Sequence, residues 1–149
     1  MLELLKDLMG FCRPIRWQSC TDWVQENINL DFDSSSGHSG KVDLSYTPYL
    51  KKPLDFWCRD SGGKMTVMAV EQTGKSSVWK WGMLWRMEHG PAPSLIVYPS
   101  AEDAADTNAD SFEPLMRGIP RLALELSRPH AKRRNCYRFT SMSLYFSGG

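Results

Sequence analysis

Two short apolar runs, each followed by a segment with helical spacing, dominate the pattern of apolar and polar positions along the chain. Residues 64–70 (KMTVMAV) and 94–98 (SLIVY) contain β-branched residues and have the length of buried strands. Residues 75–88 have helical spacing, and residues 100–116 begin with a Ser-x-x-Asp capping box typical of a helix start. This order is typical of βαβ units. We therefore expect both strands in one parallel sheet, joined by a right-handed crossover through the first helix.

The remaining segments predict shorter elements. Helices are expected at residues 2–9, from an N-cap at Thr21-Asp22 to about residue 27, and within residues 46–57, where leucine and tryptophan share one face. Residues 136–140 and 143–146 are predicted to form two strands joined by a tight turn.

The division into domains follows from one polar segment. Residues 31–40 (DFDSSSGHSG) have the composition of a linker, because serine and glycine contribute little to a packed core. We interpret residues 1–45 as an N-terminal leader with a flexible loop and residues 46–149 as one α/β domain.

Composition mainly excludes classes of protein. The chain has 149 residues, 42% of them hydrophobic, which suits one globular domain. Its net charge of +1 neither supports nor excludes nucleic-acid binding, so only local clusters of basic residues can indicate it. The four cysteines are scattered without zinc-ligand spacing, and no stretch reaches the roughly 20 apolar residues of a membrane span. We expect a cytosolic protein with no membrane partner.

The segment between the first strand and its helix matches most of the P-loop pattern G-x-x-x-x-G-K-[ST]. Ala69 replaces the first glycine, whereas Gly74, Lys75 and Ser76 occupy the other fixed positions. Gly74 lets the backbone approach phosphate, Lys75 would reach the β- and γ-phosphates, and the Ser76 hydroxyl would bind Mg²⁺. Backbone N–H groups at a helix start would complete an anion site. We predict that ATP with Mg²⁺ binds through Gln72, Thr73, Gly74, Lys75, Ser76 and Ser77.

The alternative for this segment is an exposed turn in which Lys75 is merely solvated. The strand before the motif and the helix after it favour the P-loop. Glu71 is expected to face outward, because a carboxylate beside a triphosphate is electrostatically unfavourable.

Three blocks in this order resemble the lambda-type (GpA) large terminase subunit of tailed phages. The resemblance extends from residue 46 to about residue 126, and its blocks are residues 47–55 (TPYLKKPLD), 71–76 (EQTGKS) and 93–116. It implies a P-loop NTPase-like, three-layer α/β/α fold with a mostly parallel sheet. It also implies a motor ATPase that drives double-stranded DNA into procapsids in the host cytoplasm, with the small terminase subunit and the portal as partners and with possible homo-oligomers.

The resemblance also implies that Tyr49 lies near the adenine or supports the P-loop, whereas ordinary packing at a helix start is the alternative. Members of the family continue for several hundred residues beyond the point where this sequence ends. No strand ending in Asp-Glu (the Walker B element) and no nuclease carboxylates are recognisable, so we expect a truncated chain that binds ATP without efficient hydrolysis. Its catalytic residues are unassigned.

One dense basic cluster spans residues 128–138. Within it, Lys132, Arg133 and Arg134 are candidates for DNA phosphate contacts without base specificity, and a solvated surface turn is the alternative. Two other functions remain open for the whole chain. One is a non-catalytic DNA- or protein-binding remnant with an unused P-loop, and the other is a helicase-like P-loop ATPase.

Overall fold

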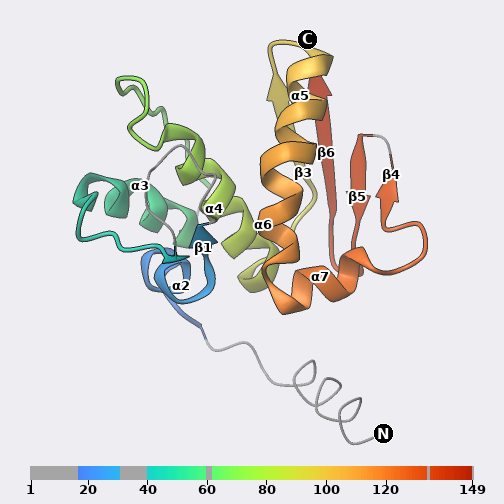
Figure 1. The fold of residues 1–149 in the computed structure, drawn as a ribbon, viewed down its shortest axis with the longest axis horizontal. Coiled ribbons are helices and arrows are strands. Elements are labelled where there is room, and N and C mark those ends of the chain that lie inside the picture. The colour runs from blue at the N-terminus through green and yellow to red at the C-terminus, as the bar shows by residue number, and fades with distance from the viewer. Residues whose placement is uncertain (1–16, 31–39, 60–61, 134, 149) are drawn as a thin grey trace, which may run out of the picture.

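The structure is a computed structural model in which a helical group lies beside a small sheet with its own helices (Figure 1). It describes residues 17–30, 40–59, 62–133 and 135–148. In chain order the elements are α2 (Cys20–Asn27), β1 (Asn29–Leu30), β2 (Gly40–Lys41), η1 (Pro48–Leu50), α3 (Lys51–Asp55), η2 (Phe56–Cys58), α4 (Lys75–His89), β3 (Ser94–Tyr98), α5 (Ala101–Thr107), the π-helical η3 (Asn108–Phe112), α6 (Glu113–Arg117), α7 (Pro120–Leu126), β4 (Lys132–Arg133), β5 (Cys136–Arg138) and β6 (Ser143–Gly148).

The main sheet is mixed, with the strand order β3-β6-β5-β4. Strand β3 pairs with β6 in parallel, with Leu95 opposite Tyr145, whereas β5 pairs antiparallel with both β6 and β4. The expectation of a mostly parallel sheet was therefore wrong for the described residues. The physical reason is the short connection between β5 and β6, since a tight turn can join only antiparallel strands.

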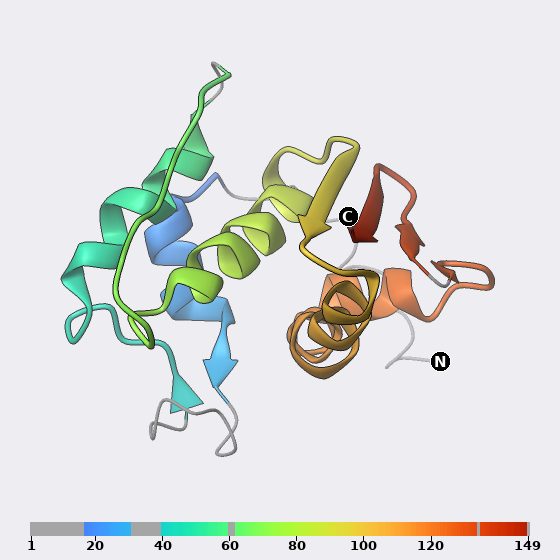
Figure 2. The same cartoon turned by 90° about the horizontal axis from the view of Figure 1, so that it is seen from above.

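Helices cover one face of this sheet. Figure 2 shows α5, α6 and α7 on the same side of β3, β6 and β5. Leu144, Phe146 and Tyr137 point to that side and are buried, whereas Leu95 and Val97 of β3 face the other way and are 62% and 64% exposed. Among the described residues, the predicted α/β class is therefore present, with two layers at this sheet.

Helix α4 joins the two groups because both of its sides are covered. Trp81, Leu84 and Trp85 have the i, i+3, i+4 spacing of one helix face and are buried, and α4 contacts α2 and α3. Trp79 lies on another side of the helix, where its ring stacks on Phe112 at a centroid distance of 5.6 Å and meets Tyr98 edge-on. The helix that follows the P-loop motif is therefore anchored in both parts of the fold.

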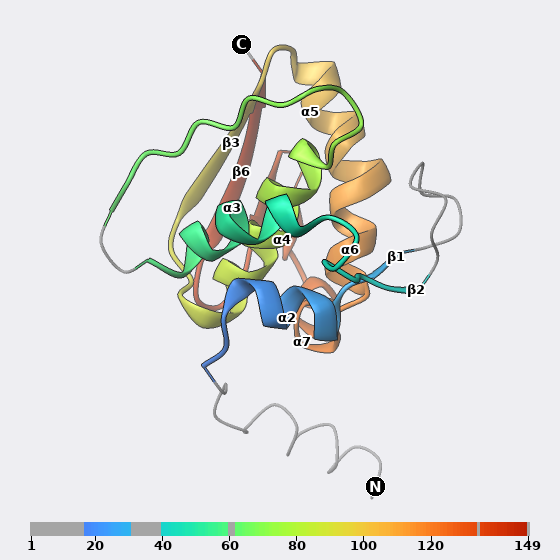
Figure 3. The same ribbon diagram turned by 90° about the vertical axis from the view of Figure 1, so that its left-hand side faces the viewer.

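The predicted strand at residues 64–70 is not formed, so the expected parallel pairing of this segment with β3 was wrong. The segment has no strand pairing, and Figure 3 shows it as an extended coil that leads into α4. Met65 packs against the core, whereas Met68 and Val70 are 91% and 79% exposed. An apolar run forms a strand only where a neighbouring strand pairs with it and buries it. The β propensity of its residues largely reflects that packing.

The predicted domain boundary at residue 45 stays a prediction, but several described residues before it belong to the core. Trp23, Val24 and Ile28 of the α2 region and Leu44 beyond β2 are all buried. Helix α2 begins one residue earlier than its predicted cap, because Ser19 is the N-cap and accepts a hydrogen bond from the Asp22 N–H. The predicted helix at residues 2–9 lies outside the described residues, as does most of the predicted loop at 31–40.

The predicted helix over residues 100–116 is present but interrupted. Ser100 caps α5 by accepting a hydrogen bond from the Asp103 N–H, which confirms the capping box. The wider π-helical turn η3 then separates α5 from α6. No helix in the described part of the chain has the length and hydropathy of a membrane span.

Candidate functional site

The P-loop motif occupies a tight turn that ends at the first residue of α4. Gly74 is the N-cap residue in the left-handed conformation, with φ 80° and ψ 17°, and Gln72 also has a positive φ of 59°. The left-handed region favours glycine because a Cβ there is sterically disfavoured. Gly74 is thus required by the turn as well as by the motif. The turn leads directly into the N-terminus of the 15-residue helix α4.

The side chain of Lys75 folds back across this turn. Its Nζ donates a hydrogen bond to the carbonyl oxygen of Ala69 at 2.7 Å, and the Thr73 hydroxyl donates to the carbonyl oxygen of Val70, also at 2.7 Å. The first of these bonds joins the first motif position to the lysine position, and the second closes the turn inside it. The ammonium group therefore lies over the loop, although the Lys75 side chain is exposed to solvent.

The first turn of α4 has the features of an anion site. The first N–H groups of a helix lack partners within the helix, and the helix dipole adds partial positive charge there. Ser76 is exposed in this turn and Ser77 is half-buried. The serine hydroxyls and free N–H groups suit a phosphate with a bound cation, and Glu71 is exposed as expected. These residues fit ATP and Mg²⁺.

The described residues contain no group of three or more His, Cys, Asp or Glu side chains able to hold a metal ion. A magnesium ion at this loop would rely on the phosphates, water and the Ser76 hydroxyl, a ligand set that Mg²⁺ commonly uses with nucleotides.

The block at residues 47–55 contacts the loop through Leu50. The side chain of Leu50 is buried, and its Cδ1 lies 3.1 Å from the position that a Cβ on Gly74 would occupy. Tyr49, the neighbouring residue in η1, is 56% exposed. The contact shows that this block supports the loop, and a role for Tyr49 beside the adenine stays a prediction.

Some residues of the basic cluster form ion pairs within the chain, and others do not. Lys132 Nζ lies 2.5 Å from Glu113 Oε2, and Arg128 Nη1 lies 2.9 Å from Glu125 Oε2. Arg133 and Arg138 are exposed and make no ion pair within the described residues. Arg134 lies outside the described residues. Of the three predicted DNA contacts, Lys132 thus has a structural partner and Arg133 is available to an external anion.

Glu113 is a buried carboxylate that the sequence did not single out. It is 6% exposed and accepts hydrogen bonds from Arg117, Lys132 and the Tyr137 hydroxyl. Burial alone would raise the pKa of Glu113, but the bonds from Lys132, Arg117 and Tyr137 outweigh it and lower the pKa to about 2. The i,i+4 spacing of Glu113 and Arg117 was visible in the sequence, whereas the other two partners come from distant strands.

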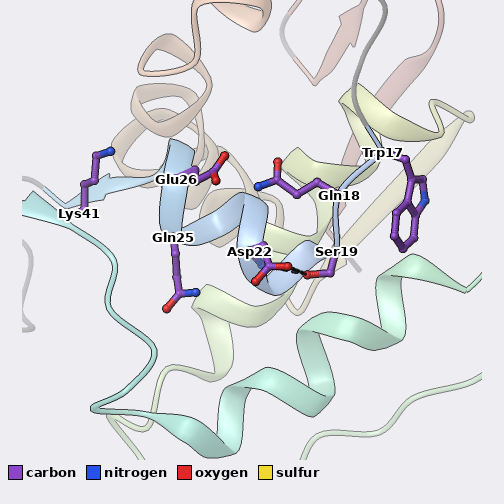
Figure 4. Close-up of a pocket in the computed structure, with 7 residues that line it drawn as sticks. All are labelled: Trp17, Gln18, Ser19, Asp22, Gln25, Glu26 and Lys41. Carbon is purple, nitrogen blue, oxygen red and sulfur yellow. Dashed lines mark hydrogen bonds between the residues drawn. The ribbon is translucent and has the colours of Figure 1, made fainter.

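Two hollows on the surface lie away from the P-loop motif. One, of about 440 Å³, follows the exposed face of α2 and is shown in Figure 4 with its lining residues Trp17, Gln18, Ser19, Asp22, Gln25, Glu26 and Lys41. These side chains are spread along the hollow and do not converge on one point. The other, of about 660 Å³, lies on the open face of the sheet, where Arg133 and Arg138 flank Leu95 and Tyr145.

Comparison with known proteins identifies one family. The family model described as the phage terminase large subunit gpA, ATPase domain, matches residues 36–148, about three quarters of the chain. No curated protein and no solved structure matched the chain.

Proposed function

The chain belongs to the ATPase-domain family of the phage terminase large subunit gpA, and from this premise we propose that it binds ATP with Mg²⁺ at residues 72–77. The observation that carries the proposal is the arrangement of Gly74 and Lys75. A left-handed glycine ends the turn, and the next residue turns its ammonium over the loop at the start of a long helix. This combination is what a triphosphate requires from backbone and side chain together.

Each residue of the loop has a role in this proposal. The N–H groups of residues 73–77 bind phosphate oxygens at the start of α4, with Gln72 shaping the turn. Lys75 exchanges its bond to the Ala69 carbonyl for the β- and γ-phosphates, so a neutral partner is replaced by a charged one. The Ser76 hydroxyl binds the magnesium ion. Bound ATP supplies the transferable phosphoryl group, and the chain holds and orients it.

We further propose that this activity serves the packaging of double-stranded DNA into procapsids, which accords with the family of the chain. The small terminase subunit, the portal and further copies of the chain are the partners that this role requires. Arg133 and Arg138 support the DNA contact, since both are exposed and line the same hollow on the open face of the sheet. Contacts of this kind bind phosphates of any sequence.

The dependence of ATP binding on Mg²⁺ tests the site. Calorimetric titration of the 149-residue chain with ATP should show binding that weakens when Mg²⁺ is removed. Ser76→Ala should reduce the difference between the two conditions, whereas Ser94→Ala should not, because the Ser94 hydroxyl bonds locally to the Ala92 carbonyl. If wild-type chain showed no ATP binding with Mg²⁺ present, a remnant with an unused loop would be the correct function.

The DNA contact has a separate test. Arg133→Ala should weaken binding of duplex DNA by a similar factor for unrelated sequences and should reduce its dependence on salt. Lys132→Ala is less informative, because it also removes a partner of buried Glu113. Lys41→Ala, an exposed lysine on β2, is the matched control for loss of one positive charge. Equal effects of Arg133→Ala and Lys41→Ala would contradict the contact.

A further inference from the structure

The open face of the main sheet carries one row of side chains that crosses all four strands. Leu95 of β3 lies opposite Tyr145 of β6. Tyr145 also lies opposite Cys136 of β5, which in turn lies opposite Arg133 of β4. Because side chains two positions apart on a strand share a face, Arg138 of β5 lies on the open face as well. Figure 2 shows α5, α6 and α7 on the other side of these strands.

Tyr145 offers an aromatic ring on this face. Its side chain is 43% exposed, whereas Tyr137 and Phe146, the neighbouring rings of the sheet, are buried on the helix side. Those two rings meet edge-on at a centroid distance of 6.1 Å. The ring of Tyr145 takes part in none of the ring contacts among the described residues. It therefore presents an apolar surface that packing inside the chain does not use.

The charges beside this ring are positive. Arg133 and Arg138 line the hollow of about 660 Å³ together with Tyr145 and Leu95, and no carboxylate is among the described residues that line it. From the spacing of strands and residues in a sheet, the Cα atoms of both arginines lie within roughly 10 Å of the Tyr145 Cα. One short stretch of an anionic ligand can therefore touch the ring and both guanidinium groups together.

A ring with cations beside it on an open sheet suits an unpaired nucleotide. Single strands bind with their bases stacked on aromatic side chains and their phosphates near basic ones, and four-stranded sheets are a common platform for this mode. The bases of a duplex are stacked on each other, so a duplex meets the arginines but not the ring. An acidic protein segment would match the arginines and leave the ring without a flat partner.

We infer that the open face of the sheet binds single-stranded DNA, with one base stacked on Tyr145 and the adjoining phosphates held by Arg133 and Arg138. Leu95 packs against the edge of that base. The inference rests on the proposed DNA contact of Arg133 and adds a contact that only an unpaired strand can make. Stacking uses the face of a base and not its edge, so binding tolerates many sequences.

The experiment compares the affinity of the full chain for a fluorescent single strand of about 12 nucleotides, an ordinary site size, and for the duplex of the same sequence at the same salt. Tyr145→Ala should weaken binding of the single strand by at least about fivefold, the lower end for one stacked base, and binding of the duplex by less than about twofold. Tyr145→Phe keeps the ring and should bind both as wild type does. Tyr46→Ala, which removes a tyrosine that is 74% exposed, is the matched control.

Cross-linking gives a second readout that needs no variant. A single strand with 5-iodouracil at one position, irradiated on wild-type chain, should become attached at Tyr145, and mass spectrometry of the peptides would show the site. The same strand annealed to its complement should attach there far less. Attachment at other residues in place of Tyr145 would contradict the inference.

The outcomes separate the inference from the DNA contact on which it rests. If Arg133→Ala weakens binding of the duplex and Tyr145→Ala leaves binding of the single strand unchanged, the inference is wrong and the DNA contact stands. Equal losses for single strand and duplex in Tyr145→Ala would also overturn it. If Arg133→Ala changes neither affinity, the DNA contact fails and the inference fails with it. Binding of an acidic peptide at this face, without Tyr145-dependent binding of single strands, would assign the face to a protein partner.

Discussion

Leu50 and Gly74 lie in direct contact, although 24 positions separate them in the chain: a Cβ on Gly74 would stand 3.1 Å from Leu50 Cδ1. The contact joins the block at residues 47–55 to the P-loop. Leu50 is almost fully buried, so its position is fixed by the core of the helical group. The loop therefore rests on a buried side chain at its last turn residue.

Substituting Gly74 should harm both the fold and the binding of ATP. Gly74→Ala forces a residue with a Cβ into the left-handed conformation, which costs about 1–2 kcal/mol, and crowds Leu50. We expect the free energy of unfolding in urea to fall by about that amount and ATP affinity to fall further. Gly62→Ala is the matched control, because a Cβ there meets nothing within 4 Å. Equal stability of the two variants would show that the turn is not as described.

The stability of the fold should depend on the charge of Glu113. Its pKa of about 2 in the folded state is below the ordinary 4.5, so the folded state favours the ionised form. This contribution, on the order of 3 kcal/mol, is present above pH 4.5 and is lost as the pH falls toward 2. Urea unfolding of Glu113→Gln should show lower stability than wild type at pH 7, with the two converging near pH 2.

A matched acidic residue controls for the general effect of charge. Glu26→Gln removes an exposed carboxylate, so its unfolding free energy should follow that of wild type across the whole pH range. A constant difference between wild type and Glu113→Gln from pH 7 to pH 2 would mean that the network contributes by packing and not by charge.

We expect the 149-residue chain to bind ATP and to hydrolyse it at a rate close to background. The described residues contain no cluster of carboxylates to complete a magnesium site, and no strand in the sequence ends in paired acids. A steady-state phosphate-release assay should therefore give far less than ~1 s⁻¹, a typical enzyme rate. A rate of ~1 s⁻¹ or more that Lys75→Ala abolishes would reveal a catalytic carboxylate elsewhere in the chain.

The edge strand β3 should make the chain self-associate. Among the described residues it pairs with β6 on one side only, and it exposes Leu95 and Val97 without a charged residue between them. Such edges favour pairing with another strand. Sedimentation velocity should show concentration-dependent association that Val97→Lys reduces. Leu124→Lys places the same charge on an exposed leucine of α7 and should have no such effect. A wild-type chain that stays monomeric at high concentration would contradict this prediction.

The elements that the sequence predicted correctly are those defined by local signals. Helix α4 follows from helical spacing, β3 from a short apolar run between turn residues, and α5 from the Ser100 cap. Residues 64–70 carried the same apolar signal as β3 but form no strand, because strand formation depends on a neighbour that the local sequence does not encode. The same limit applies to the sheet, whose mixed pairing follows from connections and not from composition.

The candidate site was predictable to a similar extent. The motif placed Gly74 and Lys75 at the start of a helix, and the structure has them there. The support from Leu50 and the closure of Lys75 onto Ala69 required the folded chain. Glu113 was invisible in the sequence because Lys132 and Tyr137 reach it from strands 19 and 24 positions away. Because Glu113 is buried and pairs with Lys132, this member of the basic cluster contributes to the fold.

Calorimetric titration of Lys75→Ala with ATP and Mg²⁺, beside wild type, is the most direct test of the P-loop. Removal of the ammonium should weaken binding by about 2–3 kcal/mol, the range for a charge-assisted contact, or roughly 30- to 150-fold. Lys64→Ala, an exposed lysine in the segment before the loop, should bind as wild type does. Equal affinity of wild type and Lys75→Ala for ATP would contradict the P-loop and the nucleotide-binding function built on it.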